Sequence, residues 1–315
     1  IHGSRDYFMI ELDEDLFIEI IPVMKISKPE ESENITDLSY SHVKYVNKKI
    51  KSQKVLDDIL IAKAFSHANH CYGAESYIQG FSGYSLELLV YYYGGFLKFI
   101  KEMAKFKENN GKEEKIIIDI EKQFKNKKEI LINLNESKLQ SPIILIDPTF
   151  KHRNTMAALS LETFNRFREA CKKFLKNPSV ESFEIKKTDL EVVEKNAKKN
   201  KYEFILIEAK TDKQEGDIAG SKLLKFKRHI LEELEKYFVI KEKGFNYNEK
   251  QAARFYFVVK SKVTRLAMGP FIEDKHHLEA FEKIHKNYFI KKGRVFANEE
   301  IKFTAKEFFV KWKKK

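Results

Sequence analysis

The feature that most constrains the fold of this chain is a change of hydrophobic pattern near Pro178. Between residues 42 and 107 the apolar residues recur at the spacing of α-helices, most clearly in the segment 54–68. After Pro178, segments with strand-like and helix-like patterns follow one another. The pattern predicts an α+β chain, with a mainly helical part followed by a part in which helices pack on a sheet.

Before Pro178 the sequence predicts a β-hairpin, four helices and one buried strand. Ser82 can cap the start of one helix, and Gly94-Gly95 can end it. The segment 108–130 is rich in Lys, Glu and Asn, so we expect a surface excursion there. The expected elements are a hairpin over 7–12 and 16–22, helices over 54–68, 83–93, 96–107 and 160–176, and a strand over 143–146.

After Pro178 the patterns alternate between strand and helix. The expected elements are a strand at 183–186, a helix at 189–199, a strand at 202–209, a helix at 218–236, strands near 237–241 and 253–260, a helix at 274–286, a hairpin over 288–296 and a helix at 304–312. The turn of the hairpin is expected at Lys292-Gly293, where glycine permits a tight reversal.

Composition bounds the class of protein and its partner. The 315 residues suffice for two or three domains. They include 59 Lys and Arg against 47 Asp and Glu, a net charge of +12, and the sequence pI is about 9.2. This excess favours a polyanionic partner, nucleic acid before an anionic membrane, although a Lys-rich proteome explains the charge equally well.

The cysteine count and the hydropathy pattern indicate the setting. Two cysteines, Cys71 and Cys171, do not make a disulfide framework, so a reducing cytoplasm is expected. No apolar run approaches the roughly 20 residues that span a bilayer, so we expect no membrane partner.

A single acid interrupts an apolar strand near the start of the chain. Glu19 lies within Phe17–Pro22, and a buried unpaired carboxylate is costly. Binding of Mg²⁺, which prefers oxygen ligands, would remove that cost and would suit nucleotidyl transfer. On the pattern alone we favour the alternative, an outward-facing Glu on an edge strand.

Three segments keep one order and spacing along the chain. They are Glu19–Pro22, the run Cys71–Glu75 continuing into Gly80–Tyr84, and Ile146–Pro148 followed by Arg153-Asn154. Together they resemble the archaeal-type (class I) CCA-adding enzymes, which are tRNA nucleotidyltransferases of the polymerase-β-like superfamily. The resemblance runs from about residue 7 to the end and is strongest over 58–100 and 142–180.

The resemblance assigns roles to particular residues. It places Glu19 at the third catalytic, metal-binding carboxylate, where the family usually has Asp, and implies Mg²⁺ as the cofactor. It implies that five residues bind the incoming CTP or ATP: Ser39, His42, Lys63, Tyr72 and Arg153. Their chemistry fits, since Lys63 offers a point charge for a triphosphate and Arg153 a planar fork for a base edge or phosphate. Each residue taken alone is better explained as a solvated or core side chain, and only their joint spacing with the segments 72–75 and 80–84 favours a nucleotide site.

The resemblance also implies an architecture. Residues 1–40 correspond to the last part of a catalytic head, 41–180 to a helical neck, and 181–315 to a body and tail that bind tRNA. Gly3-Ser4 and Asp13-Glu14-Asp15 imitate the superfamily's catalytic signature, but we interpret the acidic cluster as a turn. The true signature and the first two carboxylates are then expected before residue 1.

The function implied is template-independent addition of C, C and A to the 3′ end of tRNA. The expected partners are tRNA, CTP and ATP, and a homodimer is left open. The chain alone is expected to be inactive, because the first two catalytic carboxylates are missing. Two alternatives stand: a related nucleotidyltransferase that adds only A, and a headless or degenerate RNA-binding protein.

Two further patterns in the sequence bear on its partners. Basic clusters interleaved with aromatic residues, such as Lys222–Arg228 around Phe226 and Lys311–Lys315 around Trp312, suit salt-sensitive phosphate contacts, or are solvated helix faces. The pair His67 and His70 imitates a metal site, but no second ligand cluster accompanies it, so we do not expect a metal there.

Overall fold

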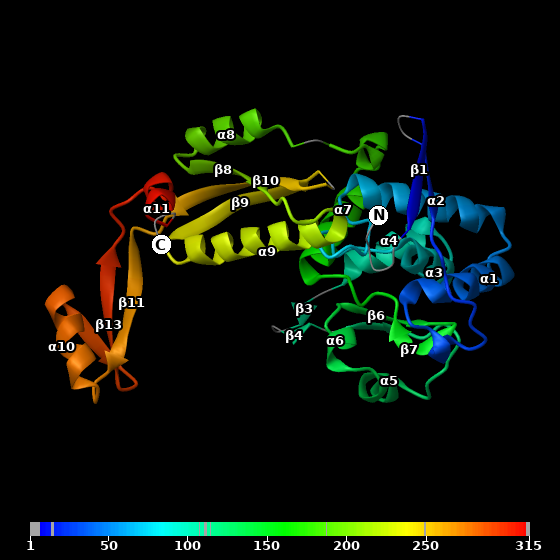
Figure 1. The fold of residues 1–315 in the computed structure, drawn as a ribbon, viewed down its shortest axis with the longest axis horizontal. Helices are drawn as coiled ribbons and strands as arrows, with labels where there is room; N and C mark the ends of the chain where they lie inside the picture. The colour runs from blue at the N-terminus through cyan, green and yellow to red at the C-terminus, as the bar shows by residue number, and fades with distance from the viewer. Residues whose placement is uncertain are drawn as a thin grey trace. The chain divides into compact units, whose positions relative to one another are not determined.

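The computed structural model describes residues 7–13, 16–106, 108–109, 112–113, 115–186, 188–248 and 250–312. The chain divides into two compact units, residues 1–187 and 188–315, which we call unit 1 and unit 2. Helices and small sheets mix along the chain, so the α and β content predicted from the sequence is confirmed (Figure 1). The division into head, neck, body and tail stays a prediction.

Unit 1 starts with the expected hairpin. Strands β1 (Phe8–Asp13) and β2 (Leu16–Ile20) pair antiparallel, with Phe8 opposite Ile20. Every side chain in both strands is exposed, although most are apolar. The expected turn at Glu14 and Asp15, like Gly3 and Ser4, lies outside the described residues.

Helices of unit 1 form at all four predicted segments, whereas the two short helices over 127–133 and 136–139 were not predicted. Ser82 caps α3 by accepting a hydrogen bond from the backbone N–H of Ser85, and Gly94 ends it in the left-handed region at φ +73°. The helices are α1 (Ser39–Lys49), α2 (Gln53–Ala68), α3 (Gly83–Tyr93), α4 (Phe96–Lys105), α5 (Lys127–Asn133), α6 (Glu136–Leu139) and α7 (Leu161–Lys176). Short 3₁₀ turns lie at Pro29–Glu31, Ile35–Leu38 and Val180–Phe183.

A cluster of aromatic rings joins the helices of unit 1. Phe65 on α2 is fully buried and lies edge-on to Phe96 of α4, 5.6 Å between ring centroids, and to Phe167 of α7, 5.8 Å. Phe174 and Phe183 complete its surroundings at 5.6 and 5.5 Å. Edge-to-face pairs at such distances add to the stabilisation from burial, so this cluster fixes α2 against α4 and α7.

A small sheet lies beside these helices and corrects one expectation. Strand β6 (Ile143–Asp147) pairs parallel with β5 (Ile116–Ile118) and antiparallel with β7 (Phe150–Asn154). The segment 108–130 is therefore not a surface excursion throughout. Its Ile116–Ile118 run joins the sheet by pairing with the buried strand β6. This strand was missed because the composition of the surrounding segment is rich in Lys. Within the same segment, β3 (Glu108–Asn109) pairs with β4 (Lys112–Glu113).

The loop between α2 and α3 is closed by backbone hydrogen bonds. Phe81 donates its N–H to the carbonyl of Cys71 and accepts from the N–H of Gly73, both at 2.8 Å. A Cβ at position 80 would lie 2.2 Å from the carbonyl oxygen of Cys71, so only glycine fits there. The loop buries Phe81 and leads into α3, where Leu86 is also buried.

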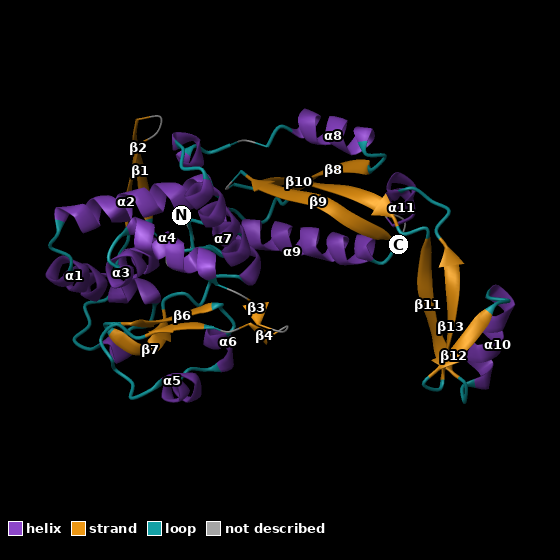
Figure 2. Ribbon diagram, turned by 180° about the vertical axis from the view of Figure 1, so that it is seen from behind, coloured by secondary structure: helices purple, strands orange, loops and turns teal. Residues whose placement is uncertain are grey.

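Unit 2 contains the expected layer of helices on a sheet. Strand β10 (Ala252–Ser261) lies between β8 (Glu203–Lys210) and β9 (Phe238–Tyr247), and both pairings are antiparallel. The two views place α8 (Leu190–Lys199) and α9 (Gly216–Glu235) on opposite faces of this sheet (Figures 1 and 2). Phe308 of α11 (Ala305–Trp312) packs on the α9 side, in one core with Phe255 and Phe257.

One predicted strand does not form, and one strand of unit 2 was not predicted. The strand expected at 183–186 does not form, because Phe183 ends a 3₁₀ turn and packs into the aromatic cluster of unit 1. The sequence analysis also missed β11 (Thr264–Phe271), which contains Gly269 and Pro270 and so lacks a clear alternating pattern.

A second sheet follows in unit 2. Strand β13 (Arg294–Glu300) lies between β11 and β12 (Tyr288–Lys291), so the predicted hairpin over 288–296 is confirmed. The helix α10 (Lys275–Ile284) packs against this sheet. Lys292 and Gly293 at the turn both have positive φ, 49° and 73°.

The aromatic cluster predicts how unit 1 responds to truncation. Phe65→Ala is expected to lower the free energy of unfolding by about 4 kcal/mol, because a fully buried ring leaves a cavity between three helices. Leu60→Ala is the matched control, since Leu60 lies on the same helix but is 64% exposed, and its effect should stay within about 0.5 kcal/mol. Urea denaturation measures both, and equal effects would contradict this assignment of the core.

Candidate functional site

A buried carboxylate at the end of β6 organises the side chains around it. Asp147 has no exposed surface, and its Oδ2 accepts a hydrogen bond from Arg153 Nη1 at 2.7 Å. His42 Nε2 lies 2.9 Å from the same oxygen. The other oxygen, Oδ1, accepts from the N–H and hydroxyl of Thr149, both at 2.8 Å, and from the Tyr84 hydroxyl at 3.2 Å. Four residues therefore converge on one carboxylate.

The geometry indicates which nitrogen of the His42 ring donates a hydrogen bond. A carboxylate only accepts, so Nε2 of His42 donates to Asp147 and carries a proton. Nη1 of Arg153 lies 3.2 Å from that nitrogen, and because both are donors they share Oδ2 as their acceptor. The His42 ring stacks on Tyr84 with centroids 4.0 Å apart, which fixes the plane of the imidazole.

The electrostatics of this network favour the ionised carboxylate. Burial acts to raise the pKa of Asp147, but the hydrogen bond and charge of His42, the charge of Arg153 and the Thr149 amide hold it below its ordinary range. Burial first, and then the negative charge of Asp147, raise the pKa of the Tyr84 hydroxyl. At neutral pH the Asp147 side chain is therefore an ionised carboxylate surrounded by hydrogen-bond donors.

Arg153 keeps donor capacity for a ligand. Its Nη1 is engaged by Asp147, whereas its Nε is buried and has no hydrogen-bond partner in the described part of the chain. A buried donor without a partner is costly, and a ligand acceptor would satisfy it. The strand β7 holds Arg153 because its neighbour Asn154 pairs with Ile146 of β6.

Lys63 and Tyr72 meet at the first residue of α3. Lys63 Nζ donates to Glu87 Oε1 at 2.6 Å, and both side chains are partly exposed. A Cβ at Gly83 would lie 3.0 Å from the Tyr72 hydroxyl and 3.8 Å from Lys63 Nζ. Glycine therefore leaves room at the N-terminus of α3, where backbone N–H groups favour anions.

The first turns of α3 connect the two groups of side chains. Tyr84 reaches the Asp147 network, whereas the adjacent Gly83 borders Lys63 and Tyr72. One turn further, Glu87 pairs with Lys63. Four residues expected from the sequence to bind a nucleotide, His42, Lys63, Tyr72 and Arg153, thus surround one helix start, although they come from separate elements.

The two remaining predicted site residues, Ser39 and Glu19, are both exposed. Ser39 is exposed and opens α1 one turn before His42, so the two share a helix face. Glu19 lies on the exposed strand β2 opposite Met9. Its neighbour on the same face is Glu11, placed diagonally across the hairpin.

The described residues do not by themselves fit a divalent metal. Among them no three His, Cys, Asp or Glu side chains are placed to share an ion. Glu19 and Glu11 supply two exposed carboxylates, fewer oxygen ligands than Mg²⁺ requires. A complete site would need ligands from elsewhere.

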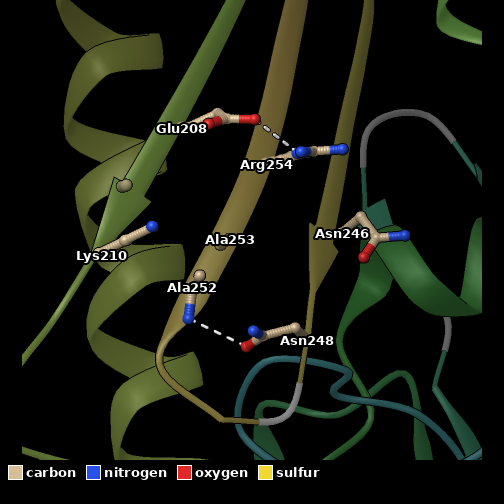
Figure 3. A pocket seen from close by; sticks show the side chains of 8 residues that line it. Glu208, Lys210, Asn246, Asn248, Ala252, Ala253 and Arg254 are labelled. Carbon is tan, nitrogen blue, oxygen red and sulfur yellow. Dashed lines mark hydrogen bonds and ion pairs between the residues drawn. The ribbon is translucent and has the colours of Figure 1, made fainter.

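A pocket of about 330 Å³ lies on the first sheet of unit 2 (Figure 3). Arg254 on its wall pairs with Glu208 at 2.6 Å. Asn248 is engaged as well, because its Oδ1 accepts from the N–H of Ala252 and so closes the β9–β10 turn. The polar groups of Arg254 and Asn248 therefore already hold the sheet together. The pocket belongs to unit 2, whereas the residues around α3 belong to unit 1.

Sequence reasoning missed three residues of the site. It noted Asp147 within the Ile146–Pro148 segment but gave it no role, and it assigned none to Tyr84 or Glu87. A signal existed for Asp147, because an acid directly after the apolar run Ile143–Ile146 is expected to be buried and to need partners. No local pattern marks Glu87, whose partner lies 24 residues away.

No helix in the described ranges is both long and apolar enough to cross a membrane. Cys71 and Cys171 are both buried and free, and burial raises the pKa of the Cys71 thiol to about 12, so this thiol stays protonated.

Known proteins resemble the chain over nearly its whole length. The family profile described as tRNA nucleotidyltransferase, second domain, matches residues 57–184. A CCA-adding enzyme of Nanoarchaeum equitans is 33% identical over 304 residues, which cover 94% of this chain and 70% of the relative.

Two other relatives, also named CCA-adding enzymes, agree. The one of Archaeoglobus fulgidus is 27% identical over 298 residues, covering 92% of this chain and 64% of the relative. The one of Methanocaldococcus jannaschii is 28% identical over 309 residues, covering 96% of this chain and 66% of the relative. The chain thus spans about two thirds of the length of these relatives.

The Asp147 network predicts a pH-dependent contribution to stability. Because the folded-state pKa of Asp147 is lowered, its contribution is complete above the unfolded-state pKa of about 4 and is lost as the pH falls below it. Asp147→Asn should lower the free energy of unfolding by about 3 kcal/mol at pH 7. The difference from the unmodified chain should shrink below about pH 4.

Urea midpoints measured between pH 3 and pH 7 test this prediction. Asp57→Asn is the matched control, since Asp57 is exposed on α2, and it should behave like the unmodified chain at every pH. A difference for Asp147→Asn that stays constant across this pH range would contradict the charged network.

Proposed function

This chain belongs to the archaeal-type CCA-adding enzymes, and from that premise we propose that it contributes to template-independent addition of C, C and A to the 3′ end of tRNA. The observation that carries the proposal is the convergence of His42, Lys63, Tyr72 and Arg153 on the start of α3. The 33% identity to a CCA-adding enzyme over 304 residues supports it.

The nucleotide is proposed to bind across the first turn of α3. Lys63, Tyr72 and the backbone N–H groups at Gly83 offer positive charge and donors for the triphosphate. For Lys63 this means exchanging its present partner Glu87 for phosphate. Arg153, whose buried Nε is unsatisfied, is proposed to face the base or a phosphate, while Asp147 holds its Nη1.

His42 and Ser39 complete the proposed nucleotide site from α1. The imidazole is held between Tyr84 and Asp147, so its orientation is set before a ligand arrives. Ser39 lies one turn earlier on the same face and presents an exposed hydroxyl. Both would donate hydrogen bonds to phosphate or ribose oxygens.

The β1–β2 hairpin supports the proposed architecture. An isolated two-stranded hairpin is marginally stable, and here both faces carry exposed apolar side chains, such as Phe8 at 69% on one face and Phe17 at 47% on the other. Strands apolar on both faces are typical of a larger, covered sheet. We therefore propose that residues 1–40 end a polymerase-β-like head, that 41–180 form the neck, and that 181–315 form the body and tail that bind tRNA.

The proposal includes a divalent metal, for which the described residues supply only some of the ligands. Mg²⁺ is proposed, with Glu19 as one ligand, and the metal would activate the 3′ hydroxyl of tRNA and screen the triphosphate. The remaining ligands would come from outside the described residues. A cytoplasmic location, in keeping with two free cysteines, completes the proposal.

A direct test supplies a catalytic head. We would fuse, ahead of residue 7, whatever segment of the Nanoarchaeum equitans enzyme precedes its match to this chain, and assay CTP and ATP with a tRNA transcript lacking CCA. The chimera is expected to add both nucleotides, and the chain alone neither. Incorporation by the chain alone would contradict the need for further carboxylates.

Arg153→Lys in the chimera tests the nucleotide site. It keeps the positive charge beside Asp147 but loses the planar fork, so kcat/KM for both nucleotides should fall between about 10-fold and 100-fold. Arg166→Lys is the matched control, since Arg166 is exposed and donates to a backbone carbonyl, and it should change kcat/KM less than twofold. If both variants have the same kcat/KM, Arg153 does not contribute to the nucleotide site.

The same assay separates the alternatives. An enzyme that adds only A would use ATP, but not CTP, on transcripts ending before and after the two cytidines. A headless RNA-binding protein would bind tRNA yet add nothing even in the chimera.

A further inference from the structure

One face of the second sheet in unit 2 is covered by α10 (Figure 2). Val295 and Ala297 of β13 are buried on this side, at 0% and 1% exposed. A Cβ at Gly269 of β11 would lie 2.8 Å from the ring of Phe281 on α10, which places Gly269 on the same side. The residues that alternate with these point to the opposite face.

That opposite face, which we call the open face, carries two rows of side chains. The first row runs across the three strands through Met268, Phe296 and Phe289, which are partners in the register. The second runs through Phe271, Arg294 and Lys291. Met268 is 63%, Phe271 50% and Phe289 45% exposed, so a large part of each of these side chains remains open to solvent.

The rings on the open face are arranged as stacking surfaces. Phe289 and Phe296 are nearly parallel, at 23° and 5.9 Å between centroids. The Arg294 guanidinium lies 4.3 Å above the Phe271 ring, and its Nη1 is 3.3 Å from the Met268 sulfur. Its Nε is buried without a hydrogen-bond partner in the described ranges. A flat guanidinium on a ring and two parallel rings both suit stacking of planar groups.

The charge around the open face is positive. Lys291 and Arg294 lie in the row next to the rings, whereas the acid Glu300 lies at the far end of β13, 3.2 Å from Lys302. Unit 2 as a whole holds 30 Lys and Arg against 20 Asp and Glu, most of the net charge of +12. The surroundings therefore favour a polyanion.

We propose that the open face binds exposed, unpaired bases of the tRNA by stacking on Phe289 and on the Phe271–Arg294 pair, with Lys291 beside the phosphates. This inference rests on the proposed function and names a surface through which unit 2 holds its RNA. Aromatic side chains on an open sheet face, flanked by cations, are a recurrent way to bind unpaired bases. A second copy of this chain fits less well, because a symmetric pair of such faces would bring Arg294 and Lys291 toward like charges.

The test measures tRNA affinity of single variants of the full chain, by fluorescence anisotropy with a transcript lacking CCA at several salt concentrations. Phe289→Ala and Phe289→Leu should each weaken binding about 10-fold, whereas Phe289→Tyr should retain it, because stacking needs a ring and not only an apolar side chain. Arg294→Ala should weaken binding and lower the slope of log affinity against log salt by about one.

Controls and contrary outcomes separate the possibilities. Ile284→Ala removes an apolar side chain that is 75% exposed on α10, and it should leave affinity unchanged. If Phe289→Ala and Phe289→Leu bind tRNA as tightly as the unmodified chain, this inference fails and the proposed function stands. If these variants abolish a dimer seen by sedimentation while affinity is unchanged, the occupant is a second copy. An unmodified chain that does not bind tRNA overturns both proposals.

Discussion

The carboxylate of Asp147 is a fully buried charge, and much of unit 1 is arranged to satisfy it. Without partners such a group would be protonated or would destabilise the fold. Its donors come from α1, α3, β7 and the turn at Thr149, so one anion connects four parts of the chain. The network orients His42 and Arg153 before any ligand arrives, which lowers the entropy cost of binding.

The start of α3 links this network to Lys63 and Tyr72, the side chains proposed to bind phosphate. Gly80 lets the preceding loop close on the Cys71 carbonyl, and Gly83 leaves room beside Tyr72 and Lys63. Adjacent residues of one helix turn therefore serve two tasks, since Tyr84 fixes the Asp147 group and Gly83 opens the space near Lys63. In an enzyme that works without a nucleic-acid template, such a rigid protein surface would have to select the nucleotide.

Much of the fold was accessible from sequence where local signals agree with tertiary structure. The segments 83–93 and 160–176 had clear periodicity and caps, and α3 and α7 formed there. Prediction failed where tertiary partners decide, as for Ile116–Ile118, which becomes a strand by pairing with β6, and for 183–186, whose Phe183 joins the aromatic cluster. The site shows the same division: resemblance indicated His42, Lys63, Tyr72 and Arg153, whereas Asp147 and Glu87 act through partners far away in sequence.

The central claim is that one nucleotide binds across the first turn of α3, between Arg153 on one side and Lys63 with Tyr72 on the other. A crystal structure of the chain grown with CTP tests it most directly. Density is expected for the triphosphate beside Lys63 and Tyr72, with a ligand acceptor at the Nε of Arg153 and the Asp147 contacts intact. Nucleotide bound away from α3, or an Arg153 released from Asp147 on binding, would contradict it.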